Sequence, residues 1–336
     1  MREITFVQAI NEAISEEMTR DERVFVMGED VRLSAFGTTG GLVEKFGPER
    51  VRNTPISETG FVGAGIGAAI TGYRPVVEIQ IATFFWVAMD QICNQASKLR
   101  YMSGGQATLP ITLRTVNGVI GSAAAQHSET MYSNFLNTPG LKIAVPSNPH
   151  DAKGMLKAAI RDDNPVLFFE HLRLGAKKGP VPETDYLVPL GKAAVVREGK
   201  DVTLIAIAWM VDIALDAAKT LEADGISAEV IDVRSLVPLD KDTIVGSVRK
   251  TGRAVVIDEA HKTGSAASEI AATIAEEAFS ALRAPVRRVC SLDVPIPFSP
   301  GMENFVIPDI AKVIAAVQDV LAGTPALAGH TDATRR

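Results

Sequence analysis

Apolar residues recur at helical spacing near the start of the chain, and short apolar runs then alternate with further helical patterns. Thr5 and Gln8 resemble a capping box, and the apolar residues after them predict a helix to about Met18. Short runs without strict polar alternation are typical of parallel strands that helices cover on both faces. The pattern predicts strands over 24–27, 75–81, 111–115, 141–145 and 166–169, and helices over 61–70, 85–101, 128–136 and 150–160.

The periodic pattern stops between residues 173 and 190 and then begins again. The stretch LGAKKGPVPETDY has no periodicity and is typical of an interdomain linker. We therefore predict an α/β protein with two mostly parallel βα domains over 1–172 and 191–322, and a disordered tail over 323–336. The second series predicts strands over 202–208, 228–233, 254–258 and 286–290, and helices over 211–223, 241–249, 265–278 and 307–321.

Composition agrees with a two-domain globular protein. The chain has 336 residues, 46% of them hydrophobic, which is enough to fill two cores. A net charge of -6 provides no basic surface, so nucleic acid is not an expected partner. The start of the chain does not resemble a secretory signal, and the longest apolar run, Val202 to Met210, is too short to span a bilayer. We expect a cytoplasmic protein with no membrane partner.

The two cysteines, Cys93 and Cys290, are far apart and have no His or Cys at metal-ligand spacing. A zinc site or a disulfide framework is therefore not predicted. Two buried, reduced thiols that act as small apolar side chains are the simpler interpretation.

A dinucleotide fingerprint is one hypothesis for the glycines near residue 65. Gly63, Gly65 and Ala68 fit G-x-G-x-x-A, and Glu78 lies where a ribose-binding acid would be expected. However, the glycines follow a polar loop instead of an apolar strand. Close packing of a buried helix explains Gly63, Gly65 and Gly67 better. A nicotinamide-dependent oxidoreductase therefore ranks third among our functional hypotheses, and a non-catalytic interaction protein ranks last.

Two polar residues stand where chemistry is possible. Glu58 lies in the turn PISETG before an apolar helix, where a partly buried carboxyl group can hold its proton and donate a hydrogen bond. An acid favoured by the helix dipole explains Glu58 more simply. His127 follows a run of small residues and could act as an acid or base near neutral pH, although a structural histidine would look the same.

Several long motifs resemble one known family across residues 4–321. They are GED, NTPISETGFVGAGIGAA, EIQIATFFWVAMDQICNQASKLRYMSGG, LPITLRTVNG, AAQHSE, NTPGLKIAVPSNPHDAKGMLKAAIRDDNPVLFFE and DVRSLVPLD. They are similar to the β subunits of pyruvate, branched-chain 2-oxo acid and acetoin dehydrogenase first components. The resemblance implies a thiamine-diphosphate pyrimidine-binding domain followed by a transketolase-type C-terminal domain.

The resemblance also implies a partner and a cofactor. In this family thiamine diphosphate lies between an α and a β subunit, and the α subunit holds the diphosphate and magnesium with a GDG motif. This chain has no GDG. We therefore expect it to be inactive without an α subunit, to form a heterotetramer of two α and two β subunits, and to pass an acyl group to a lipoyl acyltransferase core.

The family's functional residues carry over by position. Glu58 would hydrogen-bond a ring nitrogen of the cofactor aminopyrimidine. Phe84 would pack on that ring, and Ile56 would lie in the same wall. His127 would assist acyl transfer by giving a proton to a lipoyl sulfur.

The family also binds a structural potassium ion through backbone carbonyls and one carboxylate. Hard oxygen ligands suit such an ion, although a capped helix end at IRDDNP would give the same sequence. The matching positions are Leu109, Ile111, Thr112, Ala159, Asp162 and Asn164.

Three departures from the family pattern bear on the small-molecule substrate. Glu129 stands where many members have Gln, Val87 stands where pyruvate-type members often have Gln, and the loop over 31–41 is shorter than in many relatives. The motifs PSNPHDAKG and GKAAVVREGKDVTL favour acetoin or pyruvate over branched-chain acids. The alternative with the same cofactor is the C-terminal half of a split transketolase.

Overall fold

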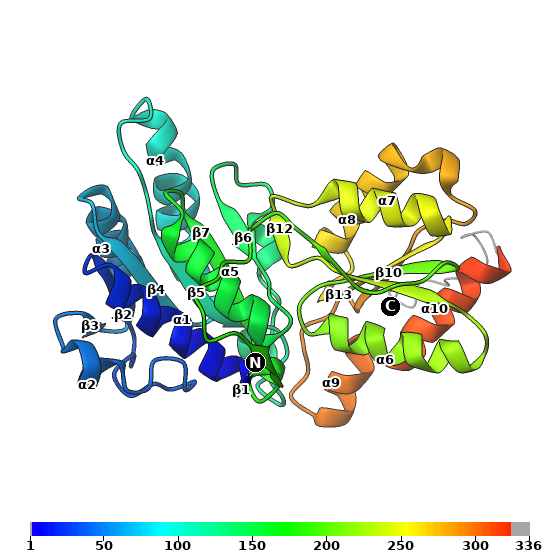
Figure 1. The fold of residues 1–336 in the computed structure, drawn as a ribbon, viewed down its shortest axis with the longest axis horizontal. Helices are drawn as coiled ribbons and strands as arrows, with labels where there is room; N and C mark the ends of the chain where they lie inside the picture. Colours follow the sequence, from blue (N-terminus) through cyan, green and yellow to red (C-terminus); the bar gives the residue numbers. More distant parts are fainter. Residues whose placement is uncertain (1, 324–336) are drawn as a thin grey trace, which may run out of the picture.

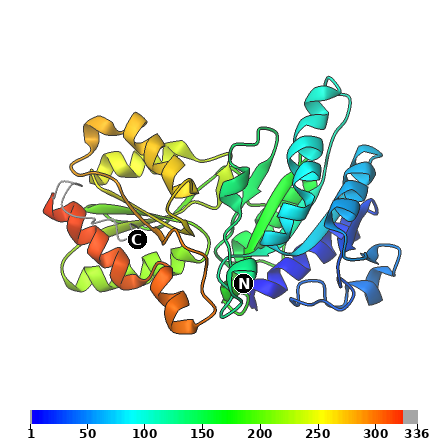
Figure 2. The same cartoon turned by 180° about the vertical axis from the view of Figure 1, so that it is seen from behind.

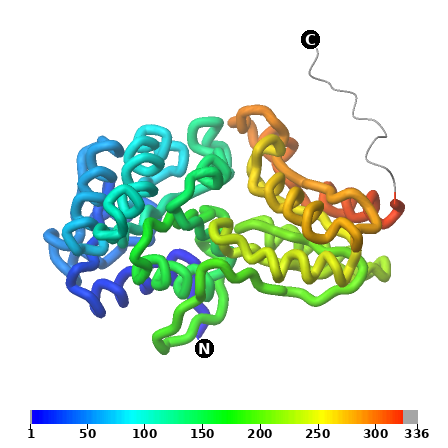
Figure 3. The backbone as a smooth tube through the Cα atoms, turned by 90° about the horizontal axis from the view of Figure 1, so that it is seen from above, coloured from blue at the N-terminus to red at the C-terminus, as the bar shows by residue number. Residues whose placement is uncertain are grey.

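The computed structural model describes residues 2–323 as two α/β domains side by side (Figure 1). The first half of the chain, blue to green, forms one domain, and the yellow and red segments lie in the other (Figure 3). The predicted fold class is confirmed. Of the tail expected to be disordered, 323–336, Gly323 caps the last helix and the other residues lie outside those described.

The first domain is built on a seven-stranded sheet in which all strands but one are parallel. The strand order is β12-β6-β7-β5-β4-β2-β3, and β12 joins β6 in antiparallel pairing from the second half of the chain. A segment of the second half therefore extends the first sheet. The strands are β2 (Val24–Gly28), β3 (Val51–Asn53), β4 (Arg74–Ile81), β5 (Thr112–Asn117), β6 (Lys142–Ala144), β7 (Val166–His171) and β12 (Ser235–Val237).

Helices cover both faces of this sheet because successive residues of its strands point to opposite sides. Along β2, Val24 and Val26 pack with α1 and α5, whereas Phe25 and Met27 pack with α3. The predicted capping box is present at Thr5, whose hydroxyl accepts from Gln8 N. The helices are α1 (Phe6–Arg20), α2 (Leu42–Phe46), α3 (Glu58–Ile70), α4 (Ser97–Met102) and α5 (Pro149–Arg161).

The second domain has a five-stranded sheet in the order β14-β13-β10-β11-β9, parallel except for β9. Helices α6 and α10 cover one face and α7 and α8 the other, as seen from behind in Figure 2. No helix within residues 2–323 is long and apolar enough to cross a bilayer. The elements are β9 (Ala194–Arg197), β10 (Val202–Ala206), α6 (Met210–Ala223), β11 (Ala228–Asp232), α7 (Lys241–Thr251), β13 (Ala254–His261), α8 (Ala266–Glu277), β14 (Arg287–Ser291), α9 (Pro300–Val306) and α10 (Ile310–Ala322).

Two predicted helices differ in the structure. The segment predicted as one helix over 85–101 has a 3-10 part (η1, Ala82–Ala88), a π part (η2, Gln91–Ala96) and α4. The helix predicted over 128–136 is wrong, since that range contains only the short 3-10 turn η4 (Tyr132–Phe135), and another, η3 (Ala125–His127), precedes it. Side chains from other elements hold this segment instead: the Asn117 amide oxygen accepts from Met131 N, and the Tyr132 hydroxyl bonds to Asp258.

The predicted linker contains regular structure. After a 3-10 turn (η5, Leu172–Leu174), strand β8 (Lys178–Val181) pairs antiparallel with β1 (Arg2–Thr5) at the start of the chain. The sequence pattern missed both strands because Pro180 and the flanking charges hide a four-residue pairing. The domain boundaries at 172 and 191 stay a prediction.

Candidate functional site

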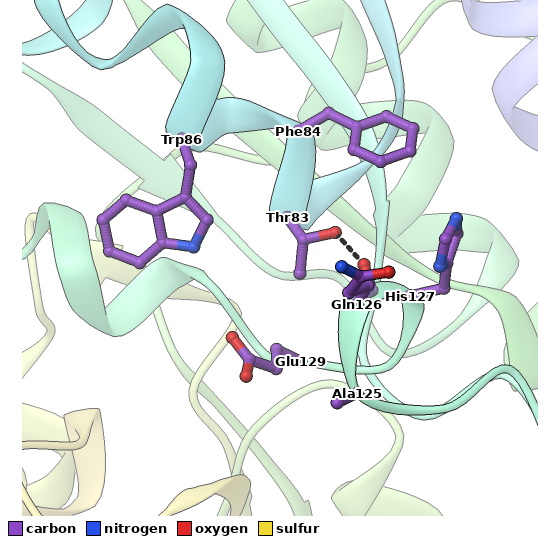
Figure 4. Close-up of a pocket in the computed structure, with 7 residues that line it drawn as sticks. All are labelled: Thr83, Phe84, Trp86, Ala125, Gln126, His127 and Glu129. Carbon is purple, nitrogen blue, oxygen red and sulfur yellow. Dashed lines mark hydrogen bonds between the residues drawn. The ribbon is translucent and has the colours of Figure 1, made fainter. Parts of the chain in front are cut away.

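A cavity of about 440 Å³ opens where two neighbouring parallel strands of the first sheet end. The turn η1 follows β4, and the loop with η3 follows β5, so their side chains meet at the carboxyl edge of the sheet. This edge is where open α/β sheets bind ligands. The residues that line the cavity, shown in Figure 4, are Thr83, Phe84, Trp86, Ala125, Gln126, His127 and Glu129.

Two of the predicted site residues contact each other in the wall of this cavity. The rings of Phe84 and His127 stand edge to face, with centroids 5.5 Å apart and an interplanar angle of 82°. The Thr83 hydroxyl donates to the Gln126 carbonyl and ties η1 to the turn that carries His127. Trp86 is 51% exposed. In Figure 4, Trp86 and Glu129 lie to the left of Phe84 and His127.

Glu58 is the first residue of α3 and is buried. Its neighbour Thr59 donates from its hydroxyl to the Val87 carbonyl at 2.5 Å, which holds the start of α3 against η1. Among residues 2–323 no hydrogen bond or ion pair to the Glu58 carboxyl group is seen. Burial and a free carboxyl group together suit a hydrogen bond to a ligand.

A second acidic side chain lies beside Glu58. The pKa of Glu29 is raised, first by burial and then by the charge of Glu58. Within the described residues, Glu29 Oε1 and the Thr54 hydroxyl are buried without a hydrogen-bond partner. Since buried polar atoms normally find partners, this region has room for polar atoms of a ligand, as the expected aminopyrimidine would provide.

Ile56 is not brought to the cavity. Ile56 is 84% exposed on this chain, and it does not line the cavity that Phe84 and His127 line. Its expected place in a cofactor wall therefore stays a prediction.

The six positions expected to bind potassium do come together. Leu109 N donates to the Asp163 carbonyl and Val166 N to the Ile111 carbonyl, so the start of β5 lies against the segment that follows α5. The Asp162 carboxylate pairs with Lys142 and accepts from Asn164. Carbonyl and carboxylate oxygens at the negative end of a helix suit a cation. Thr112, Ala159 and Asn164 complete the set.

Two nitrogen cations already lie at the end of α5. Arg74 Nη1 donates to the carbonyls of Ile160 at 3.0 Å and Asp162 at 3.1 Å, and Lys142 Nζ contacts the Asp162 carboxylate. Burial raises the pKa of Asp162, but its hydrogen bonds with Lys142 and Asn164 and the charge of Lys142 lower it below its ordinary value. The donor set fits a cation, although part of its negative charge is balanced by the protein.

The glycines near residue 65 do not form a dinucleotide fingerprint. They lie inside α3, and not in a turn between a strand and a helix. A Cβ at Gly65 would meet Val77 Cγ2 at 2.8 Å, as expected for close packing, and one at Gly63 would meet the Gln91 side chain at 3.3 Å. The packing explanation is wrong for Gly67, which has nothing within 4 Å.

Family comparisons cover nearly the whole chain. Residues 2–177 match the transketolase pyrimidine-binding domain, and residues 191–313 match the transketolase C-terminal domain. The β subunit of acetoin:2,6-dichlorophenolindophenol oxidoreductase from Bacillus subtilis is 47% identical over 97% of this chain and 99% of its own length. The chain belongs to the dehydrogenase β-subunit family. It is an oxidoreductase subunit, and the resemblance found in the sequence is confirmed.

Other members of this dehydrogenase β-subunit family differ in the substrate that they name. The 2-oxoisovalerate dehydrogenase β subunit of Bacillus subtilis is 47% identical over 95% of this chain and 99% of its own length. The mitochondrial pyruvate dehydrogenase E1 β-1 subunit of Arabidopsis thaliana is 46% identical over 94% of this chain and 88% of its own length. Identity at this level does not separate the three substrates.

One solved structure bears on the alternative. A split gene transketolase, described as an inactive β4 tetramer, shares 27% identity with a TM-score of 0.78 and covers 95% of this chain and 99% of its own. That identity is well below the 47% of the dehydrogenase relatives. Split transketolase is therefore the weaker alternative.

The sequence analysis missed some residues of the site. Glu29 lies in the GED motif that supported the family resemblance, but nothing in its spacing indicated that it neighbours Glu58. Trp86 was predicted only as part of an amphipathic helix over 85–101, and Thr83 was not singled out. Their contacts with the loop that follows β5 are long-range, and no local pattern reports them.

Proposed function

We propose that this chain supplies the pyrimidine-binding half of a thiamine-diphosphate site and forms the active enzyme with an α subunit. When bound, the cofactor supplies an electron sink for cleavage next to a carbonyl group. The α subunit holds most of the diphosphate and magnesium. We further propose a heterotetramer of two α and two β subunits, in the cytoplasm, that transfers an acyl group to a lipoyl acyltransferase core.

In this proposal Glu58 keeps a proton at the ring nitrogen of the aminopyrimidine. The Glu58 carboxyl group is buried and has no hydrogen-bond partner among residues 2–323, so it is free to bond to that nitrogen. Glu29 lies beside it. Phe84 packs on the ring and is itself in edge-to-face contact with His127, with ring centroids 5.5 Å apart.

His127 is the proton donor at the opening dithiolane. It is half-buried in the wall of the cavity and lies on a loop, where the acyl acceptor can reach it from solvent. An imidazole that titrates near neutral pH suits proton donation. The observation that carries the proposal is this arrangement of Glu58, Phe84 and His127 at one sheet edge, in a chain that matches dehydrogenase β subunits over almost its whole length.

We propose a substrate of the acetoin or pyruvate class. Among residues 2–323, the cavity is lined by one carboxylate, Glu129, and by no lysine or arginine. A carboxylate there disfavours an anionic substrate relative to a neutral one. Acetoin therefore ranks above pyruvate, and branched-chain 2-oxo acids rank last.

The experiment is dye reduction dependent on thiamine diphosphate, with this chain alone and mixed with a GDG-bearing α subunit. Acetoin, pyruvate and branched-chain 2-oxo acids are compared as substrates. We expect turnover only in the mixture. If a stable complex forms but turns over none of them, and instead moves a ketol unit between sugar phosphates, the split transketolase alternative is correct.

We also propose that a potassium ion binds at the oxygen cluster around Asp162. A ligand that binds only the folded state raises the melting temperature with its concentration. Replacing choline chloride by potassium chloride at constant ionic strength should therefore stabilise the chain. Equal melting temperatures in the two salts would contradict the site.

A further inference from the structure

The loop over 118–131 carries His127 but has little regular structure of its own. It leaves the sheet after β5 and contains only the short turn η3. Two of its non-glycine residues, Ser122 and Ala124, have positive φ angles of 52° and 59°. Such angles persist only where surrounding contacts impose them. The position of His127 therefore depends on what holds this loop.

The first anchor is Glu259 on β13, in the second domain. Its Oε2 accepts from Val119 N at 3.0 Å and from the Thr130 hydroxyl at 3.3 Å, so one carboxylate holds both ends of the loop. The same oxygen lies 2.9 Å from His171 Nε2. Since His171 Nδ1 accepts from Arg173 N, Nε2 carries the hydrogen and donates to Glu259.

The second anchor is Glu303 on α9. Its Oε2 accepts from Ser122 N at 2.8 Å, and its Oε1 pairs with Arg173 Nη2 at 3.1 Å. Arg173 also donates from Nε to the Val119 carbonyl at 3.1 Å and lies over the Trp209 ring. Three charged side chains, two of them from the second domain, thus fix the backbone of the first half of the loop.

Packing reinforces these bonds. Glycine is required at Gly118, where φ is 83° and a Cβ would collide with the carboxylate of Glu259 and the imidazole of His171. The next residue, Val119, is fully buried in a small apolar cluster of the second domain. Its partners there are Ile296, Val306 and Ile307.

A glutamate is energetically unfavourable at the buried position of Glu259. Glu259 is 5% exposed, and within the described part of the chain its Oε1 has no hydrogen-bond partner. Leaving a buried carboxylate partly unsatisfied is energetically unfavourable. An apolar side chain would fill this space at lower cost, whereas a group that must accept hydrogens from two groups of the loop and from His171 has to be an anion or an amide.

We propose that Glu259 and Glu303 are positioning residues that hold His127 for acyl transfer. The second domain thus controls this step, although none of its described residues lines the cavity. The inference rests on the proposed function. It predicts that loss of Glu259 lowers acyl transfer by the assembled enzyme much more than dye reduction, because dye reduction does not need acyl transfer to a lipoyl group.

The test uses the complete complex with its α subunit and compares Glu259→Ala with Glu229→Ala. Glu229 is also a buried glutamate of the second domain, held by Ser247 and Lys250 away from the loop. In Glu259→Ala we expect lipoyl-dependent acyl transfer to fall about 10- to 100-fold, the size that misplacement of a functional group produces. Dye reduction should change less than about threefold, in line with a role confined to the later step.

Three further readouts separate positioning from general damage. Glu259→Gln should restore part of the lost acyl transfer, since an amide oxygen can accept the same hydrogens. In a His127→Ala background, Glu259→Ala should have little additional effect on transfer. Amide hydrogen exchange over 118–131 should speed up in Glu259→Ala and in Glu303→Ala but not in Glu229→Ala.

Equal losses of both activities in Glu259→Ala and Glu229→Ala, or a full additional loss in the His127→Ala background, would overturn the proposal. Unchanged exchange over 118–131 in both loop-anchor variants would do the same. A wild-type complex that shows no dye reduction contradicts the proposed function instead, and the exchange measurement still decides whether the two glutamates hold the loop. Should Glu259→Ala not fold, Glu303→Ala carries the same comparison.

Discussion

Two acids meet beside the cavity that holds Phe84 and His127. Glu58 is buried at the start of α3, and Glu29 lies close enough for the charge of Glu58 to raise its pKa, after the larger effect of burial. Two neighbouring buried carboxyl groups do not both ionise easily. Burial and the charge of Glu58 therefore favour the neutral form of Glu29, and a neutral carboxyl group can donate a hydrogen bond.

Glu58→Gln should abolish turnover while the complex with the α subunit still assembles. The amide keeps the shape of the side chain but cannot exchange a proton with the ring, and loss of such a group costs about 100-fold or more. Dye reduction by the assembled complex measures the loss, and size-exclusion chromatography measures assembly. Glu49→Gln, at a glutamate whose side chain is 91% exposed, is the control. Normal turnover in Glu58→Gln would remove Glu58 from the site.

Glu129→Gln should change which substrate is preferred. Removing the carboxylate from the cavity wall removes a repulsion of about 1 kcal/mol for an anion some 4 Å away, or roughly fivefold in binding. The KM for pyruvate should therefore fall about fivefold relative to the KM for acetoin. Steady-state kinetics on both substrates test this. Equal changes in the two KM values would show that Glu129 does not set charge selectivity.

Among the elements, those with strong local signals were predicted well. Helices α1 and α5 and the central strands were found within a few residues of their ends, because each combines an apolar period with a cap or a turn. The helix predicted over 128–136 failed because its amides and hydroxyls bond to distant residues, among them Asn117 and Asp258. Periodicity cannot report such partners, and the site's own loop was thus the segment hardest to predict.

The site residues that lie in sequence motifs were predicted, and those that depend on long-range contacts were not. Family motifs indicated Glu58, Phe84 and His127, and the structure brings Phe84 and His127 together. The anchors of the loop could not be predicted, since Glu259 lies more than a hundred residues from Val119 and on a strand of a different sheet. Long-range contacts of single side chains leave no trace in local spacing.

A pair of glycines in α3 tests how this helix packs on the sheet. Gly65→Ala should lower the free energy of unfolding by about 1–3 kcal/mol, because the new methyl group would lie 2.8 Å from Val77 Cγ2 in a filled core. Gly67→Ala, two residues further along, has open space and should raise it by about 0.5–1 kcal/mol through helix propensity. Urea unfolding of the purified chain measures both. Similar effects at the two positions would contradict the packing described for α3.

At the scale of the whole molecule, the two domains meet through polar groups as well as apolar ones. Ser147 of the first domain donates to Asp232 at the end of β11, and Arg234 pairs with Asp151 on α5. These bonds lie beside β12, the strand that the second half of the chain adds to the first sheet. Because several of these groups are buried, the contact between the domains responds to protonation.

The raised pKa of Asp232 determines how the stability of the chain changes with pH. Burial, with the nearby charge of Asp151, raises its pKa to about 7 from an ordinary value of 3.8, against the lowering effect of Ser147 and Arg234. Between these two values the folded chain holds a proton that the unfolded chain has lost. The free energy of unfolding contributed by Asp232 is therefore present at low pH and falls as the pH rises towards 7, by at most about 1.4 kcal/mol per pH unit.

Asp232→Asn should remove this part of the pH dependence. The amide resembles the protonated acid in shape and charge, so the variant should keep its stability between pH 5 and pH 8 better than the parent chain does. Urea unfolding at several pH values measures the slope, and Asp216→Asn, at an exposed position of α6, shows the effect of losing an ordinary carboxylate. Other buried acids, including Asp258, whose pKa is also raised by burial, add the same slope to all three proteins. Parallel curves for the parent chain and Asp232→Asn would therefore mean that Asp232 is ionised in the folded protein and that the contact between the domains does not depend on its proton.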